Sequence, residues 1–150
     1  MKEHSLSEFA DEMNLIMPVL MKEIARQYLK ELNRVEITLP QFLILDFLHR
    51  EGGSKMTTLA NVMHVSTAAM TGIVNRLVEG KYLQRTYKAE DRRVITMRPT
   101  ARGNALVKNM NAKRRAMVID IFGKISAADR ENYLRVLTQI KKILVEREQR

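Results

Sequence analysis

Residues 66–77 (STAAMTGIVNRL) have the apolar spacing of a helix, and one face of that helix is nearly free of bulky or charged side chains. This face carries Ala68, Thr71, Gly72 and Asn75. Glycine inside an exposed helix costs roughly 1 kcal/mol relative to alanine, so the face is a poor choice for an ordinary surface helix. An Asn amide can pair with adenine N6 and N7, a Thr hydroxyl or methyl can contact a base, and small neighbours allow close approach to a groove. The chemistry open to these residues is hydrogen bonding, and the plain alternative is a surface helix weakened by a glycine.

No set of residues in the sequence has the spacing of a catalytic or metal site. The chain has no cysteine, which excludes disulfides, thiolate catalysis and cysteine-based sensing. The three histidines, His4, His49 and His64, are scattered and do not share metal-ligand spacing. Neither a glycine-rich phosphate loop nor a nucleophile with an adjacent base motif is present. We therefore expect a protein that is not an enzyme and that uses no cofactor or metal.

Positive charge is concentrated in the middle of the chain. Residues 53–102 hold nine Lys or Arg and three acids, so +6 of the net charge of +9 falls there. A localised excess of this kind favours a polyanion such as nucleic acid as a partner. Charge alone fits a merely basic, soluble protein equally well.

The sequence carries no pattern of a membrane or exported protein. No apolar run approaches the ~20 residues that a bilayer-spanning helix needs. The N-terminal residues include acids and lack the apolar core of a signal peptide. We expect a cytoplasmic protein without a membrane partner.

The residues around 66–77 predict a helix-turn-helix followed by a β-hairpin. Thr57 is expected to cap a short helix, a tight turn follows, and Ser66 caps the helix described above. Residues 82–88 and 93–99 have strand-like composition, and the polar stretch KAEDRR joins them. The hairpin therefore has a basic tip.

Long amphipathic helices flank this middle part. Apolar residues recur at helical spacing over 6–35, a length of roughly 45 Å at 1.5 Å per residue. Thr38 and Gln41 have capping-box spacing and begin a second, central helix. Two further helices are expected over 101–124 and after Ser126. The first helix is longer than a middle lobe of about 65 residues, so part of its apolar stripe must pack against other elements. The C-terminal helices of the same chain and of a second chain are the expected partners, which predicts a symmetric dimer.

This order of elements, ending in DRRVITMRPTARG, resembles the MarR (multiple antibiotic resistance regulator) family of winged-helix repressors. The family's wing signature is Asp-x-Arg, five residues, then Leu-Thr, with a glycine commonly following. The residues that match it are Asp91, Arg93, Thr100 and Gly103. Two residues depart from the family pattern, because Pro99 stands in place of Leu and Lys81 in place of the Gly that usually ends the recognition helix.

The resemblance implies a mainly α architecture, with a winged helix-turn-helix and a small β-hairpin wing. The DNA-binding lobe would comprise residues 37–100. Residues 1–36 and 101–150 would supply the long N- and C-terminal dimerisation helices. The two copies would bind double-stranded DNA at a pseudo-palindromic operator, with half-sites about one helical turn apart.

The resemblance also implies which residues contact DNA. The helix over 66–77 would enter the major groove, and the hairpin tip would reach the minor groove. Residues on or beside the major-groove face are Ser66, Thr67, Ala68, Thr71, Gly72, Asn75 and Arg76. Residues of the wing are Arg92 and Arg93 at its tip, Arg85 and Lys88 as phosphate contacts, and Asp91, which would pair with an arginine and fix its direction.

A small-molecule effector is a further expectation. Met13, Met17 and Met21 lie at i, i+4 and i+8, and such a stripe can line an adaptable pocket, although it more often belongs to a core or a dimer interface. The family often senses phenolic or other small lipophilic anions, and Tyr28 could orient one. The predicted function is a dimeric, sequence-specific regulator of transcription, a repressor released by such a ligand. Two alternatives stay open: a constitutive or architectural DNA-binding protein without an effector, and a winged-helix module that binds protein.

Overall fold

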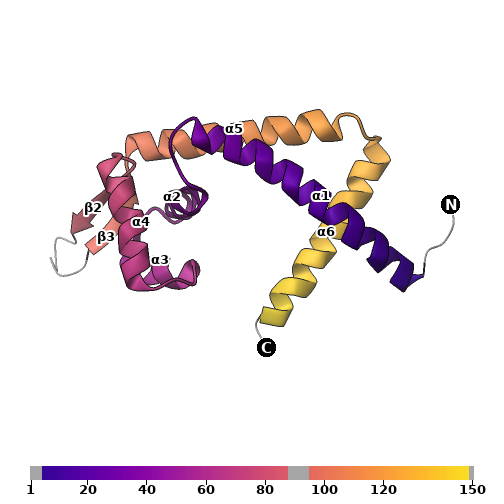
Figure 1. Ribbon diagram of the computed structural model, residues 1–150, viewed down its shortest axis with the longest axis horizontal. Helices are drawn as coiled ribbons and strands as arrows, with labels where there is room; N and C mark the ends of the chain where they lie inside the picture. Colours follow the sequence, from indigo (N-terminus) through magenta and orange to yellow (C-terminus); the bar gives the residue numbers. More distant parts are fainter. Residues whose placement is uncertain (1–4, 88–94, 149–150) are drawn as a thin grey trace. The chain divides into compact units, whose positions relative to one another are not determined.

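The computed structural model describes residues 5–87 and 95–148 and divides the chain into two units, Met1–Met110 and Asn111–Arg150. It contains helices and one small sheet, as expected for a winged helix (Figure 1). No helix among the described residues is long and apolar enough to cross a membrane. The elements in chain order are α1 (Leu6–Asn33), α2 (Leu39–Glu51), β1 (Ser54–Lys55), α3 (Met56–Val62), α4 (Thr67–Glu79), β2 (Leu83–Tyr87), β3 (Ile95–Pro99), α5 (Ala101–Phe122) and α6 (Ala127–Glu148).

Local capping signals set where α1 and α2 begin. The Ser5 hydroxyl accepts from the Glu8 backbone N–H, and the Glu8 carboxylate accepts from the Ser5 backbone N–H at 2.8 Å. These hydrogen bonds lower the pKa of Glu8 below its usual value. Thr38 and Gln41 form the second capping box, as predicted. The first helix ends at Asn33, two residues before its predicted end.

The start of α3 differs from the prediction. Thr57 does not cap it, because α3 begins at Met56 and Lys55 occupies the N-cap position without a side-chain cap. Lys55 belongs to the short strand β1, which pairs antiparallel with β3. This pairing explains Gly53, whose φ is 147° and where a Cβ would lie 2.9 Å from Arg98 Cγ and 3.2 Å from the Met97 carbonyl oxygen. A strand of only two residues is too short to show an alternating pattern, so the sequence did not predict β1.

The predicted hairpin is present and is part of a three-stranded antiparallel sheet in the order β1-β3-β2. The register pairs Leu83 with Pro99 and Arg85 with Met97. Pro99 ends β3, and the Thr100 hydroxyl then accepts from the Gly103 backbone N–H at 3.1 Å, which caps α5. The predicted end of the second strand and the predicted cap are confirmed.

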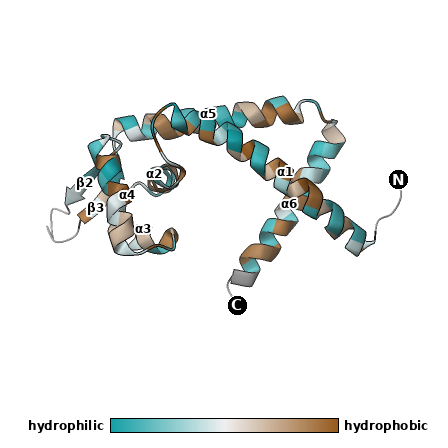
Figure 2. Cartoon of the chain, viewed as in Figure 1, coloured by the Kyte–Doolittle hydropathy of each residue, from teal (hydrophilic) through white to brown (hydrophobic). Residues whose placement is uncertain are grey.

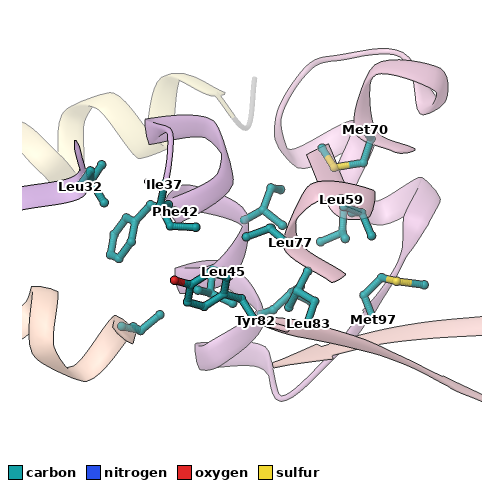
Figure 3. Packing of buried hydrophobic residues seen from close by; sticks show 14 of the residues in the cluster. Leu32, Ile37, Phe42, Leu45, Leu59, Met70, Leu77, Tyr82, Leu83 and Met97 are labelled. Atoms are coloured by element: carbon teal, nitrogen blue, oxygen red, sulfur yellow. The ribbon is translucent and has the colours of Figure 1, made fainter. Parts of the chain in front are cut away.

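One hydrophobic core holds the first unit together (Figure 3). Helix α2 is central, as predicted, because Phe42, Ile44, Leu45 and Leu48 are all buried. The flanking helices also contribute, with Leu32 from α1 and Val107 and Met110 from α5. Further core residues are Leu59, Met70, Val74, Leu77, Tyr82, Leu83 and Met97.

None of the residues of the second unit whose burial the structure describes is buried. Every described side chain of α6 is exposed, although apolar residues recur along the helix (Figure 2). Local contacts join α6 to the end of α5: the rings of Phe122 and Tyr133 lie 5.4 Å apart, and the Arg130 guanidinium donates to the Phe122 and Ile125 carbonyls. These contacts leave most of the apolar surface of the unit open to water.

Candidate nucleic-acid interface

Helix α4 begins at an exposed cap. The Ser66 hydroxyl accepts from the Ala69 backbone N–H at 3.1 Å, as the sequence predicts. Thr67 and Ala68 in the first turn are exposed. The backbone N–H groups of a helix N-terminus can bind an anion such as a phosphate, so this end of α4 is open to such a contact.

The bare face of α4 points away from the core. Met70, Val74 and Leu77 are buried on one side of the helix, and Gly72 lies on the opposite side. A Cβ placed at Gly72 would meet no atom within 4 Å. Packing among the described residues therefore gives no reason for a glycine here.

Thr71 and Asn75, which flank Gly72 on this side of α4, both have hydrogen-bond partners. The Thr71 hydroxyl donates to the Thr67 carbonyl at 2.8 Å, which leaves its methyl group and its oxygen lone pairs for other contacts. The Asn75 Oδ1 accepts from Arg85 Nη2 at 2.6 Å. Sequence reasoning placed Asn75 and Arg85 in the same interface but missed this contact, because no periodicity relates a helix residue to a residue on the next strand.

Arg76 lies at the other end of the face. Its side chain is exposed and lines a hollow of about 370 Å³ beside the C-terminus of α4. Lys81, Tyr82 and Arg102 line the same hollow, together with Glu79. The Arg102 guanidinium stacks over the Tyr82 ring at 4.5 Å and donates to its hydroxyl at 3.1 Å. Glu36 also lines the hollow, so Arg76 is part of a mixed surface of three basic and two acidic residues that extends from α4 to the start of α5.

The family departure at Lys81 has a clear structural consequence. The Lys81 backbone N–H donates to the Val78 carbonyl and the Tyr82 N–H to the Leu77 carbonyl, which is the Schellman pattern that ends many helices. Lys81 occupies the position that favours glycine, with a φ of 60°. The cap therefore forms without glycine and carries the strain of a left-handed lysine.

Replacing Lys81 by glycine should stabilise the protein. A non-glycine residue in the left-handed region destabilises the folded state by about 1–2 kcal/mol. Glycine removes this strain but loses more backbone entropy on folding, which offsets part of the gain. We therefore expect the free energy of unfolding to rise by about 0.5–1 kcal/mol. Thermal unfolding should show a melting temperature higher by about 1–4 °C. Lys81→Ala is the matched control, because it removes the same side chain but keeps the strain; an equal gain in that variant would contradict the explanation.

Gly103 lies where α5 packs against the turn between α4 and β2. A Cβ there would clash with the Tyr82 carbonyl oxygen and lie 3.1 Å from Leu45 Cδ1. The same Tyr82 carbonyl accepts from the Thr100 backbone N–H at 3.0 Å, and the Thr100 hydroxyl donates to the Lys81 carbonyl at 2.7 Å. The absence of a side chain at Gly103 therefore allows the start of α5 to pack directly against the backbone at Tyr82.

Gly103→Ala should destabilise the protein by about 1–3 kcal/mol, because the clash is with backbone that is fixed by these hydrogen bonds. Chemical unfolding measures the change. Gly72→Ala is the control, since a methyl group there meets no atom and should instead add roughly 1 kcal/mol. Equal stability of the two variants would show that Gly103 is not tightly packed.

The wing is described only at its base. Arg85 on β2 is exposed. The predicted tip residues and their support lie outside the described residues; they are Lys88, Asp91, Arg92 and Arg93. Their roles remain the predictions made from the sequence.

The structure does not bring the predicted effector residues together. Met13 lines a small apolar hollow of about 300 Å³ on α1 with Phe9 and Ile16. The Tyr28 ring packs edge-on against Phe42 at 5.4 Å and belongs to the margin of the core. Along a straight helix Met13 and Tyr28 are separated by roughly 22 Å. Met17 lies between these two residues on α1, is 38% exposed and does not line the hollow at Met13.

Curated sequences include relatives that span most of this chain. The HTH-type transcriptional regulator YpoP of Bacillus subtilis (strain 168) is 26% identical over 129 residues, which cover 84% of this chain and 92% of the relative. The HTH-type transcriptional repressor MdtR of the same organism is 26% identical over 114 residues, or 76% of this chain and 74% of the relative. These relatives are regulators of transcription, which agrees with the expectation that this chain is not an enzyme.

Solved structures share the fold. A MarR family protein from Bacillus stearothermophilus superposes with a TM-score of 0.84 over 95% of this chain and 99% of its own, at 18% identity. Streptococcus pneumoniae FabT, solved in complex with DNA, superposes with a TM-score of 0.77 over 91% of this chain and 98% of its own, also at 18% identity. The model of the MarR family matches residues 37–95, which include α2, α3, α4 and β2. Residues 37–95 of this chain therefore match the MarR family, and the fold of the chain is that of the MarR family protein above.

Proposed function

We propose that the protein is a homodimeric regulator that binds double-stranded DNA in a sequence-specific manner through α4 and the wing. The observation that carries the proposal is the face of α4 around Gly72. Gly72 is exposed there, Thr71 and Asn75 beside it are half-buried and uncharged, and packing within the described chain does not explain the glycine. A face of this kind lets a helix backbone lie deep in a major groove, with Thr71 and Asn75 at the base edges.

Phosphate contacts would supply most of the affinity. The N-terminus of α4 at Ser66 and Thr67 offers backbone donors and a favourable dipole. Arg76 extends the same surface, and Arg92 and Arg93 would enter the minor groove, where the negative potential is strongest. The charge of +6 on residues 53–102 supports a polyanionic partner of this class.

The dimer would form through the long helices. Tyr133, Leu137, Ile140 and Leu144 are all 42–55% exposed in the single chain and recur along one face of α6. Apolar side chains are also exposed along α1. Water-exposed stripes of this extent call for a partner, and a second copy would also supply the two-fold symmetry that a pseudo-palindromic operator requires.

We also propose that the protein represses transcription and that a small lipophilic or phenolic ligand releases it from DNA. A repressor among the relatives and a MepR-like protein, 28% identical and solved with pseudoligands, support this step. A ligand can release DNA only if it binds one arrangement of the two lobes better than the other. Titrating small phenolic carboxylates into the DNA complex tests the step; unchanged DNA affinity with every compound would favour a constitutive DNA-binding protein.

Salt dependence tests the DNA proposal itself. The protein should retain a mixed-sequence duplex at low salt, and log K should fall with log [salt] at a slope near −0.9 for each neutralised phosphate. Six phosphate contacts would reduce the affinity about a thousandfold between 50 and 200 mM salt. If no duplex is retained at 50 mM salt, the proposal is wrong and a winged-helix module that binds protein becomes the better account.

A further inference from the structure

A hydrogen bond joins the recognition helix to the wing at the centre of the proposed interface. Arg85 Nη2 on β2 lies 2.6 Å from Asn75 Oδ1 on α4. A guanidinium has only N–H donors, so the amide oxygen of Asn75 must face the arginine and its NH₂ group must point elsewhere. The contact therefore leaves the NH₂ group of Asn75, and not its oxygen, available for other hydrogen bonds.

The backbone on both sides of this contact is rigid. The Tyr82 N–H donates to the Leu77 carbonyl at 2.8 Å, which fixes the turn between α4 and β2. Arg85 itself is paired with buried Met97 on β3. The two side chains thus project from fixed points, and forming their hydrogen bond requires ordering of the side chains alone.

We propose that Arg85 is a positioning residue for sequence readout: it holds the Asn75 amide so that its NH₂ group donates to an acceptor on a purine edge in the major groove. This inference rests on the proposed DNA-binding function and deepens it. Purines present N7, and guanine also O6, as acceptors in that groove. An amide without the arginine could rotate and present either its oxygen or its nitrogen, and would discriminate less between base pairs.

A role in phosphate binding alone has a different consequence. Arg85 has five N–H donors and uses one for Asn75, so it could also contact a phosphate. A phosphate contact raises the affinity for all duplexes alike, because it carries no sequence information. A positioning role instead changes the ratio between the affinity for a preferred duplex and that for random duplex.

The test is a double-mutant cycle on that ratio. A preferred duplex is first selected from a randomised pool with the unaltered protein. Its affinity relative to random duplex is then measured for Asn75→Ala, Arg85→Ala and the double variant. Arg85→Ala should lower the ratio about threefold to thirtyfold, and adding it to Asn75→Ala should change the ratio no further.

Two further variants separate charge from positioning. Arg98→Ala removes an exposed arginine of the same sheet that does not contact Asn75 in the described structure, and it should weaken both duplexes equally. Arg85→Lys restores the charge but not the planar fork, so it should recover affinity for random duplex without recovering the ratio. Thermal unfolding of each variant checks that the fold is intact.

Each outcome of the cycle bears on the inference. If Arg85→Ala lowers both affinities equally and the ratio stays constant, Arg85 is a phosphate contact and the inference is wrong. Multiplying losses in the double variant would also overturn it, because they would show two independent contacts. If the unaltered protein selects no duplex at all, the proposed function fails, and this inference fails with it for a distinguishable reason.

Discussion

Lysine in place of Ile140 should separate the proposed dimer into monomers and cost 10²–10⁴-fold in affinity for a symmetric duplex, at the scale by which linking two binding modules raises avidity. Ile140 lies among the apolar residues of one face of α6 and is 44% exposed in the single chain. In a two-fold symmetric interface the substitution places a charge in both copies of the same patch. Sedimentation should give a mass near 17.4 kDa for the variant and near twice that for the unaltered protein.

Thr138→Lys is the control for this experiment. Thr138 lies on the opposite side of α6 from Ile140, where its hydroxyl donates to the Leu134 carbonyl at 2.8 Å. The added charge is the same, so the variant should stay dimeric and keep its DNA affinity. If Ile140→Lys remains dimeric, the apolar face of α6 is not the interface. If it becomes monomeric with undiminished affinity, binding does not need two copies.

Lysine in place of Gly72 should uncouple stability from recognition. A Cβ at Gly72 meets no atom within 4 Å, and lysine is a far better helix former, so the free energy of unfolding should rise by roughly 1 kcal/mol. The long side chain would nevertheless occupy the clearance that the groove needs. We expect affinity for the preferred duplex to fall roughly 10- to 100-fold, as for loss of one or two base contacts. Binding to random duplex should not fall, because positive charge is added.

Gly72→Ala distinguishes bulk from helix propensity in this prediction. Alanine adds one methyl group, so it should raise stability by a similar amount and retain most of the affinity for the preferred duplex. Fluorescence anisotropy gives the affinities for both duplexes, and chemical unfolding gives the free energy of unfolding of each variant. A Gly72→Lys protein that binds preferred and random duplex equally more tightly would mean that the face of α4 does not enter the groove.

Sequence signals predicted the elements whose geometry is local. Thr38 with Gln41, Ser66 and Thr100 each cap a helix through contacts three residues away, so their spacing alone carries the information. The alternation of the wing strands and the stop at Pro99 are local in the same sense. The Thr57 cap failed because pairing of β1 with β3, a long-range contact, moved the start of α3 back to Met56.

Long-range contacts also explain what the sequence could not give for the site. It placed Asn75 and Arg85 near the same surface, but their hydrogen bond depends on how β2 lies against α4. It flagged Lys81 as a departure, whereas the tolerance of lysine at a φ of 60° follows from the backbone hydrogen bonds around it. The methionine spacing on α1 could not indicate a pocket, because a helical stripe specifies a face and not what covers it.

The selection of duplexes from a randomised pool tests the central claim most directly. A homodimer that places α4 of each copy in a major groove should enrich a two-fold symmetric sequence with half-sites about one helical turn apart, roughly 10–10.5 base pairs from centre to centre. Asn75→Ala should relax the preference at one symmetric pair of positions within that sequence. Enrichment of a single asymmetric half-site would contradict the dimeric arrangement, and no enrichment over the starting pool would contradict sequence-specific binding by the face around Gly72.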